Sequence, residues 1–252
     1  MSKDRDKADE QRYVLGIHPV EELLQTNASS IKTLYLAPEP RRDGLKAIAD
    51  KGRAAGLQIV TETMQQLDKR AAGTRHQGAV ALTAAFPYAD LDAVLKTLKD
   101  KEIATVVLLD SVQDPHNTGA IIRSACAFGV DLVVLPKDRA APITPQVERA
   151  AAGTTSRIPI ARVVNLKRAM ETLKDQGFWI AGAGTRDGVA LDKFEFANKT
   201  ALVIGAEGDG MRAGIEAALD HVVTIPISER AESLNASTAA AVILYERSRK
   251  QR

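Results

Sequence analysis

Residues 104–136 read ATVVLLDSVQDPHNTGAIIRSACAFGVDLVVLP, and this stretch decides the fold. It opens and closes on a continuous apolar run, over residues 104–110 and 131–136. Between the two runs, residues 118–128 carry apolar side chains in a helical pattern. Strands that are apolar on both faces and alternate with helices are typical of a parallel sheet covered on both sides. The stretch therefore predicts a strand–helix–strand unit of an α/β fold.

The same alternation continues to the C-terminus. Further strands are expected at residues 157–163, 178–183, 200–205 and 221–227, and helices at residues 144–152, 165–176, 210–219 and 235–250. Trp179 lies in one of these strands and is expected in the core. Ligands bind beyond the carboxyl ends of parallel strands. We therefore expect a site where the loops DSVQDPHNTGA, GAGTRDG, GAEGDGMR and SERAESLNAST come together.

A second, smaller pattern precedes this block. Helices are expected at residues 16–25, 43–55 and 63–71, and strands at residues 31–37, 58–62 and 78–86. This order predicts a small α/β domain over residues 12–86, after a charged, disordered tail at residues 1–11. Residues 87–101 are expected to form a linker with a short helix, and residues 102–252 the larger domain.

Composition excludes several classes of protein. Hydrophobic residues make up 45% and charged residues 26% of the 252 residues, as in ordinary soluble globular proteins. Cys126 is the one cysteine, so no internal disulfide can form; this fits the reducing cytoplasm, and the side chain is expected to be a small buried one. No apolar run is long enough to span a bilayer, so no membrane partner is expected. No two of the four histidines have metal-ligand spacing, so no metal site is expected.

Charge is distributed unevenly, although the net charge is only +2. Residues 41–76 hold eight basic and four acidic side chains. The basic ones are Arg41, Arg42, Lys46, Lys51, Arg53, Lys69, Arg70 and Arg75. Such a surplus suits a face that contacts phosphates, and a solvated helix surface explains it about as well. Two interpretations of His76 also stay open: contact with RNA, and a structural role in its loop.

The glycine-rich loops do not match known nucleotide motifs. Residues 182–188 give the order G-x-G-x-x-x-G and residues 205–210 give G-x-x-G-x-G, neither of which is the dinucleotide fingerprint, and no P-loop is present. The polar residues of the loops form no Ser–His–acid or Cys–His arrangement. They are Asn117, Arg123, Glu207, Ser233 and Asn235. Such residues supply hydrogen bonds and charge, which suits an enzyme that moves a group between two bound substrates.

Three stretches carry a specific resemblance. NTGAIIRSA (117–125), LVIGAEGDGM (202–211) and IPISERAESLNASTAAA (225–241) resemble, in order and spacing, the three motifs of the TrmH-type (SpoU) 2′-O-ribose RNA methyltransferases of the SPOUT superfamily. GIHPVEELL (16–24) and HQGAVA (76–81) resemble the family's N-terminal RNA-binding domain, which is similar to the ribosomal L30e/L7Ae fold. Within the family, the chain is most similar to bacterial enzymes that methylate a guanosine of 23S ribosomal RNA.

The resemblance implies a fold, partners and a site. It implies that the larger domain is a SPOUT α/β domain with a trefoil knot, that the protein is a cytoplasmic homodimer, and that large-subunit ribosomal RNA is its partner. It implies S-adenosyl-L-methionine as cofactor, held mainly by backbone groups at Gly205, Ile225 and Leu234. The catalytic and RNA-contacting positions it implies are Asn117, Arg123, Glu207, Ser233 and Asn235.

The resemblance implies that Arg123 lies beside the target ribose. Arginine is chemically unsuitable as a literal general base, because a guanidinium holds its proton in proteins. The hypothesis is that Arg123 pairs with the neighbouring phosphate and stabilises the developing 2′-oxyanion. Asn117 would hold the rotamer of Arg123, and Ser233 and Asn235 would fix the ribose. Glu207 would orient Arg123 or accept a hydrogen bond from the substrate. Two alternatives stay open: methylation of tRNA by the same chemistry, and a non-catalytic RNA-binding protein.

Overall fold

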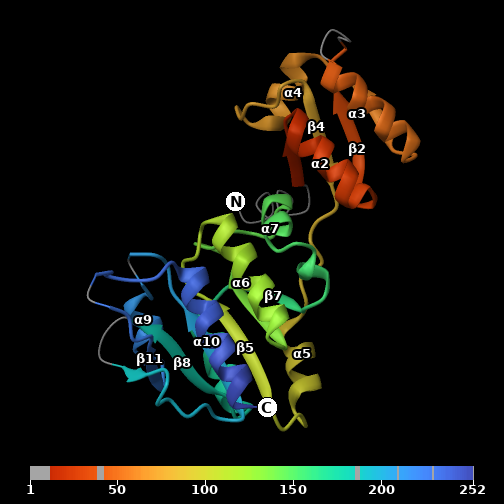
Figure 1. The fold of residues 1–252 in the computed structure, drawn as a ribbon. Helices are drawn as coiled ribbons and strands as arrows, with labels where there is room; N and C mark the ends of the chain where they lie inside the picture. The colour runs from red at the N-terminus through yellow and green to blue at the C-terminus, as the bar shows by residue number, and fades with distance from the viewer. Residues whose placement is uncertain (1–11, 39–42, 185–187, 209, 229, 252) are drawn as a thin grey trace. The chain divides into compact units, whose positions relative to one another are not determined.

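The structure is a computed structural model that describes residues 12–38, 43–184, 188–208, 210–228 and 230–251. It divides the chain into two compact units, residues 1–87 and 88–252 (Figure 1). The tail expected at residues 1–11 lies outside the described residues, as do Arg41 and Arg42. Residues 87–101 were expected to form a linker with a short helix. The helix is present as α5 (Leu91–Leu98), but residues 88–101 belong to the second unit, in whose core Leu95 and Leu98 are buried.

The first unit is a small α/β domain. Its elements are β1 (Arg12–Leu15), α2 (Ile17–Asn27), a 3₁₀ turn (Ala28–Ser30), β2 (Ile31–Leu36), α3 (Asp43–Ala54), β3 (Gln58–Thr61), α4 (Met64–Ala71) and β4 (Ala79–Thr83). The strands form one sheet in the order β1-β4-β2-β3, in which β2 and β3 are parallel and the other pairs antiparallel. Strand β1 was not expected, because four residues beside the tail carry too short a pattern.

Helices pack their apolar faces against this sheet. Leu23 of α2 and Ile48 of α3 pack with Leu34 of β2 in one buried cluster. Helix α4 begins with a capping box, in which Thr63 and Gln66 exchange side-chain and backbone hydrogen bonds, and it buries Leu67. The first unit therefore has a core of its own.

The second unit is an α/β domain with a parallel sheet, as expected. Its elements are α5 (Leu91–Leu98), β5 (Ala104–Leu109), α6 (Pro115–Ala127), β6 (Leu132–Pro136), α7 (Pro145–Ala150), a 3₁₀ turn (Thr154–Ser156), β7 (Ile160–Val163), α8 (Leu166–Asp175), β8 (Trp179–Gly184), β9 (Val189–Ala190), β10 (Lys199–Ile204), α9 (Ala213–Glu216), β11 (His221–Thr224) and α10 (Ala236–Lys250). The described strands lie in the order β7-β6-β5-β10-β8-β11-β9, and neighbours pair in parallel.

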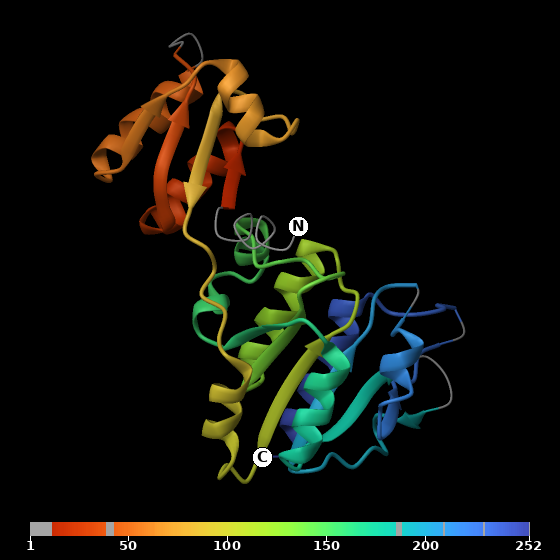
Figure 2. The ribbon, with the colours of Figure 1, turned by 180° about the vertical axis from the view of Figure 1, so that it is seen from behind.

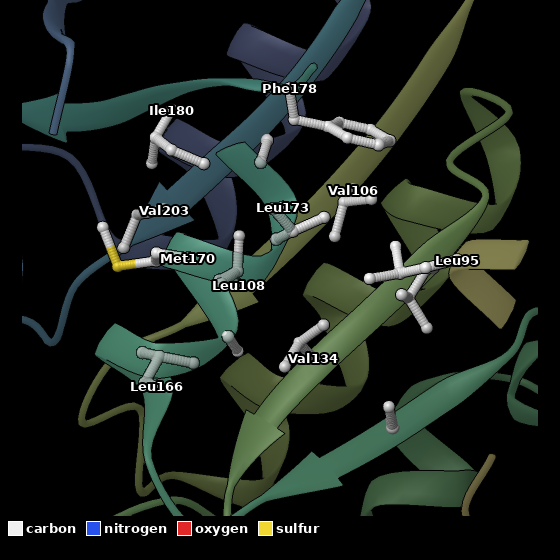
Figure 3. Packing of buried hydrophobic residues seen from close by; sticks show 14 of the residues in the cluster. Leu95, Val106, Leu108, Val134, Leu166, Met170, Leu173, Phe178, Ile180 and Val203 are labelled. Atoms are coloured by element: carbon white, nitrogen blue, oxygen red, sulfur yellow. The ribbon is translucent and has the colours of Figure 1, made fainter. Parts of the chain in front are cut away.

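Helices lie on both faces of this sheet. Figure 1 shows α6 and α10 in front of it, and Figure 2, from behind, shows α8 on the opposite face. Figure 3 shows the core between α8 and the sheet from close by. Leu166, Met170 and Leu173 of α8 pack there against alternate residues of the strands. Val106 and Val203 are two of these strand residues. The sheet is thus buried on both sides, which explains why its strands read as continuous apolar runs.

Helices α6 and α7 approach each other at a glycine. A Cβ atom built on Gly119 would lie 2.4 Å from the Cβ of Ala150 and 2.6 Å from the carbonyl oxygen of Val147. Both distances are far inside normal van der Waals contact, so only glycine permits this approach. Gly119 thereby seats the helix that carries Asn117 and Arg123.

Several local expectations are wrong, each for a physical reason. Trp179 is 53% exposed and stacks on His221 at a centroid distance of 5.3 Å, because it is the first residue of β8 and lies at the amino edge of the sheet. Cys126 is only half-buried. Strand β7 begins after Pro159 and β11 ends before Pro226, since proline lacks the N–H that a ladder needs.

No helix among the described residues is long and apolar enough to cross a membrane.

Candidate active site

The loops that carry the three motifs meet at one edge of the parallel sheet. Strand β10 pairs with β5 and with β8, and β8 pairs with β11, always in parallel. The segments after β5, β10 and β11 therefore leave the sheet at its carboxyl edge. The sheet order, rather than the order along the chain, brings these three segments together.

Helix α6 presents Asn117 through a local cap. The side chain of Asp114 accepts hydrogen bonds from the backbone N–H groups of His116 and Asn117, each at 3.2 Å. Pro115 occupies the first turn, where its missing N–H leaves no backbone partner unsatisfied. This start fixes Asn117, which is half-buried, at the end of α6 that faces the carboxyl edge.

Helix α10 begins with Asn235 as its cap. Asn235 Oδ1 accepts hydrogen bonds from the backbone N–H of Ser237 at 2.9 Å and of Thr238 at 3.3 Å, and from Ser237 Oγ at 2.6 Å. The oxygen of the amide is thus committed to the helix end. The Nδ2 group is left to donate elsewhere.

The Nδ2 group of Asn235 joins the three motifs. Asn235 Nδ2 donates to Asn117 Oδ1 at 3.0 Å and makes a short hydrogen bond to Glu207 Oε1. The same carboxylate oxygen accepts the backbone N–H of Ala236 at 3.3 Å, at the positive end of the α10 dipole. One amide therefore connects α6, the loop after β10 and α10.

Arg123 and Ser233 stand apart from this network. Both side chains are exposed, and among the described residues neither forms a hydrogen bond or ion pair. Asn117 directs its side-chain oxygen to Asn235, so it does not hold the Arg123 rotamer in this structure. Arg123 is not buried in the apolar run of its helix; its charge is available at the surface.

The loop after β10 folds back on itself beside Glu207. Ala206 and Gly210 exchange backbone hydrogen bonds of 2.9 Å and 3.2 Å. A Cβ atom on Gly205 would lie 2.5 Å from the carbonyl carbon of Gly210, so the closed loop requires glycine there. Helix α9 is correspondingly short, since residues 210–212, expected at its start, belong to the loop.

A buried carboxylate holds the far end of this loop. Asp110 follows β5 and is 0% exposed. Its Oδ2 accepts the backbone N–H of Arg212 at 2.8 Å, and its Oδ1 accepts Nε at 2.7 Å and Nη2 at 2.6 Å of the same residue. The sequence reasoning missed this pair. The available signal was an acidic residue at the end of a wholly apolar strand, which needs a partner when buried.

The three positions expected to bind the cofactor carry unused backbone groups. Gly205 is buried, and Ile225 and Leu234 are half-buried. Within the described part of the chain, no hydrogen bond involves the backbone N–H or C=O of these three residues. Buried backbone groups are nearly always paired, so such groups suit a bound ligand with a flat polar edge. The residues present therefore fit a cofactor held by backbone contacts.

In the first unit, much of the predicted positive charge is paired. Lys51 binds Glu21 at 2.6 Å, and Arg53 binds Asp50 at 2.9 Å. Arg70 makes two hydrogen bonds to Glu62, and the guanidinium lowers the pKa of this carboxyl. The basic residues Lys46, Lys69 and Arg75 are exposed.

His76 has a structural role, which was one of the two open interpretations. It is 3% exposed. The backbone N–H of Gly78 donates to Nδ1 at 3.1 Å, so Nδ1 is unprotonated, and Nε2 donates to Asp68 Oδ1 at 2.9 Å. Both ring nitrogens are thereby used within the unit.

Comparison with known proteins agrees with the two-unit division. Residues 104–245 match the SpoU rRNA Methylase family, and residues 13–89 match the RNA 2′-O ribose methyltransferase substrate binding family. A protein of Staphylococcus haemolyticus, assigned to the TrmH family of tRNA/rRNA methyltransferases, is 35% identical over 96% of this chain and 97% of its own. The 23S rRNA (guanosine-2′-O-)-methyltransferase RlmB of Coxiella burnetii is 35% identical over 93% of this chain and 94% of its own.

A solved structure shares the fold. The SpoU methyltransferase AviRb of Streptomyces viridochromogenes, in complex with the cofactor AdoMet, is 24% identical, with a TM-score of 0.65 over 100% of this chain and 94% of its own. Both units of the chain, the motif order and the relatives therefore agree: the chain belongs to the SpoU (TrmH) family of RNA 2′-O-ribose methyltransferases.

Proposed function

We propose that this chain methylates the ribose 2′-hydroxyl of a guanosine in 23S ribosomal RNA. The observation that carries the proposal is the Asn117–Asn235–Glu207 network, which gathers all three family motifs at one sheet edge. A substrate-binding unit precedes it along the chain, and a relative of 35% identity is named for this reaction.

S-adenosylmethionine is the cofactor of this family, and it supplies an electrophilic methyl group on a sulfonium. Gly205, Ile225 and Leu234 would hold it through the backbone groups that have no partner among the described residues. Half-buried apolar side chains at Ile225 and Leu234 suit an adenine face.

Arg123 would bind and polarise the RNA. It is exposed, and a guanidinium stays protonated in proteins, so it can pair with a phosphate and stabilise a developing 2′-oxyanion. Asn235 and Glu207 would hold the motif loops together, and Ser233 would hydrogen-bond the ribose. A 2′-hydroxyl is presented best by a loop or splayed nucleotide, which favours such a substrate over a regular duplex.

The same proposal includes a homodimeric, cytoplasmic enzyme whose second unit is knotted. Val242 and Tyr245 of α10 are 37% and 55% exposed, and Tyr245 meets Phe128 at a centroid distance of 5.9 Å, which supports an apolar contact with a second copy. The knot is what the family resemblance implies, and it would involve α10, which follows β11 and lies beside α6 (Figure 1). Light scattering of the purified protein tests the dimer.

The test of the activity is transfer of labelled methyl groups to total RNA from cells that lack this gene, followed by mapping of ribose methylation. We expect label at one 23S guanosine, and its loss in Arg123→Ala. Lys96→Ala is a matched control, because it removes one exposed cation from α5, a helix that leads into the amino end of β5. Label in tRNA would support the first alternative, which the name of the Staphylococcus relative accommodates. Absence of cofactor binding would refute the proposal and favour a non-catalytic RNA-binding protein.

A further inference from the structure

We infer that Asp110 and Arg212 form a clasp that positions the loop of residues 205–212 for cofactor binding. Both are positioning residues: the contacts below place neither of them on the reacting atoms. The inference rests on the proposed use of S-adenosylmethionine, and it adds a pair of residues that lies outside the predicted catalytic and cofactor-binding sets.

The clasp closes the loop at its base. The loop begins at Gly205, immediately after β10, whose last residue Ile204 accepts the backbone N–H of Asp110 at 2.8 Å. It ends at Arg212, whose backbone N–H and guanidinium both donate to the Asp110 carboxylate. One residue at the end of β5 therefore holds both ends of the loop.

The tip of the loop is held independently. Ala206 and Gly210 pair through their backbones, and Glu207 reaches Asn235 Nδ2 and the N–H of Ala236. The described residues of the loop are therefore held at Arg212 by Asp110 and at Glu207 by the start of α10. Gly205 and Glu207 consequently lie at the carboxyl edge.

Burial makes the clasp specific. Asp110 is 0% exposed, so its charge needs the guanidinium, whereas the Arg212 side chain is 40% exposed and can be hydrated without a partner. Asp110→Asn therefore leaves no buried unpaired charge. Its amide oxygen still accepts the N–H of Arg212, while the ionic contact to the guanidinium is lost.

The chain contains a matched control at the opposite edge of the same sheet. Asp220 precedes β11, accepts the backbone N–H of Ile180 at 2.8 Å and binds Lys174 Nζ at 2.6 Å. It thus resembles Asp110 in its partners, a backbone N–H and a side-chain cation, but its side chain is 26% exposed and it lies at the amino edge, away from the motif loops. Asp220→Asn should cost stability without changing the site.

The test measures dissociation constants of S-adenosylmethionine and RNA by calorimetry on the full chain, with thermal unfolding in parallel. We expect Asp110→Asn to weaken cofactor binding about ten-fold, equal to about 1.4 kcal/mol, with RNA affinity unchanged. Asp220→Asn should bind the cofactor as the wild type does. The double variant Asp110→Asn/Arg212→Met should bind no worse than Asp110→Asn, because the contact is already broken.

The outcomes separate this inference from the proposed function. Wild-type protein that fails to bind S-adenosylmethionine refutes the proposed function. Wild-type binding together with unchanged cofactor affinity in Asp110→Asn refutes the clasp, whatever happens to stability. Equal weakening in Asp110→Asn and Asp220→Asn also refutes it, because the effect would then follow general destabilisation.

Discussion

Replacing Gly119 by alanine should destabilise the second unit by about 2 kcal/mol. The new methyl would lie 2.4 Å from the Cβ of Ala150, 2.6 Å from the oxygen of Val147 and 2.9 Å from the nitrogen of Ala151. Carbon atoms normally sit about 3.5–4.0 Å apart, so α7 must move away by about 1 Å. Two of the three obstacles are backbone atoms, which places the overpacking cost at about 3 kcal/mol, the upper end of its usual range. Better helix propensity returns about 1 kcal/mol.

Urea unfolding followed by tryptophan fluorescence measures this loss, because Trp179 is the one tryptophan and lies in the second unit. Gly214→Ala is the matched control. Gly214 also lies in a helix, α9, but no heavy atom stands within 4 Å of the position that its new methyl would take, so no destabilisation is expected. The steric reasoning would be refuted if Gly119→Ala unfolded at the wild-type urea concentration or above it.

Substitutions at three further positions test other features of the structure. Arg247→Met should destabilise the second unit by about 1–3 kcal/mol in the same urea experiment, because the buried guanidinium donates to three backbone carbonyls and two threonine hydroxyls, which lose this donor. An unchanged midpoint would contradict this. Ser111→Gly should raise the unfolding free energy by up to about 1 kcal/mol, since Ser111 has a φ of 63°, and Ser111→Val should lower it. Glu62→Gln should cost the first unit about 1 kcal/mol at pH 7, measured by circular dichroism. Arg70 lowers the folded-state pKa of Glu62 from 4.5, so its stabilisation is present above pH 4.5 and is lost as the pH falls through the lowered value; a cost that persists at pH 2 would contradict this.

The sequence predicted the buried strands and the edge of the sheet at which the motif loops lie. The apolar runs of β5, β6 and β10 predicted buried parallel strands because both faces of each strand are covered. The motif loops were expected at the carboxyl edge because parallel strands end there, and Asn117, Glu207 and Asn235 do meet at that edge. Predictions failed where neighbours distant in the sequence decide burial, as for Trp179, which begins β8 and is exposed at the amino edge of the sheet.

Long-range placement was decided only by the tertiary structure. Asn117 and Asn235 are 118 positions apart, and Asp110 and Arg212 are 102 positions apart. Their contacts depend on β10 lying between β5 and β8, and nothing in the local pattern of any one strand specifies its neighbours. The sequence by itself indicated most of the strands, the helices and the polar loops, because these follow from local periodicity, although it missed β1 and extended α9 into the loop before it. The tertiary structure alone decided which loops share an edge, because strand order is set by the packing of the whole sheet.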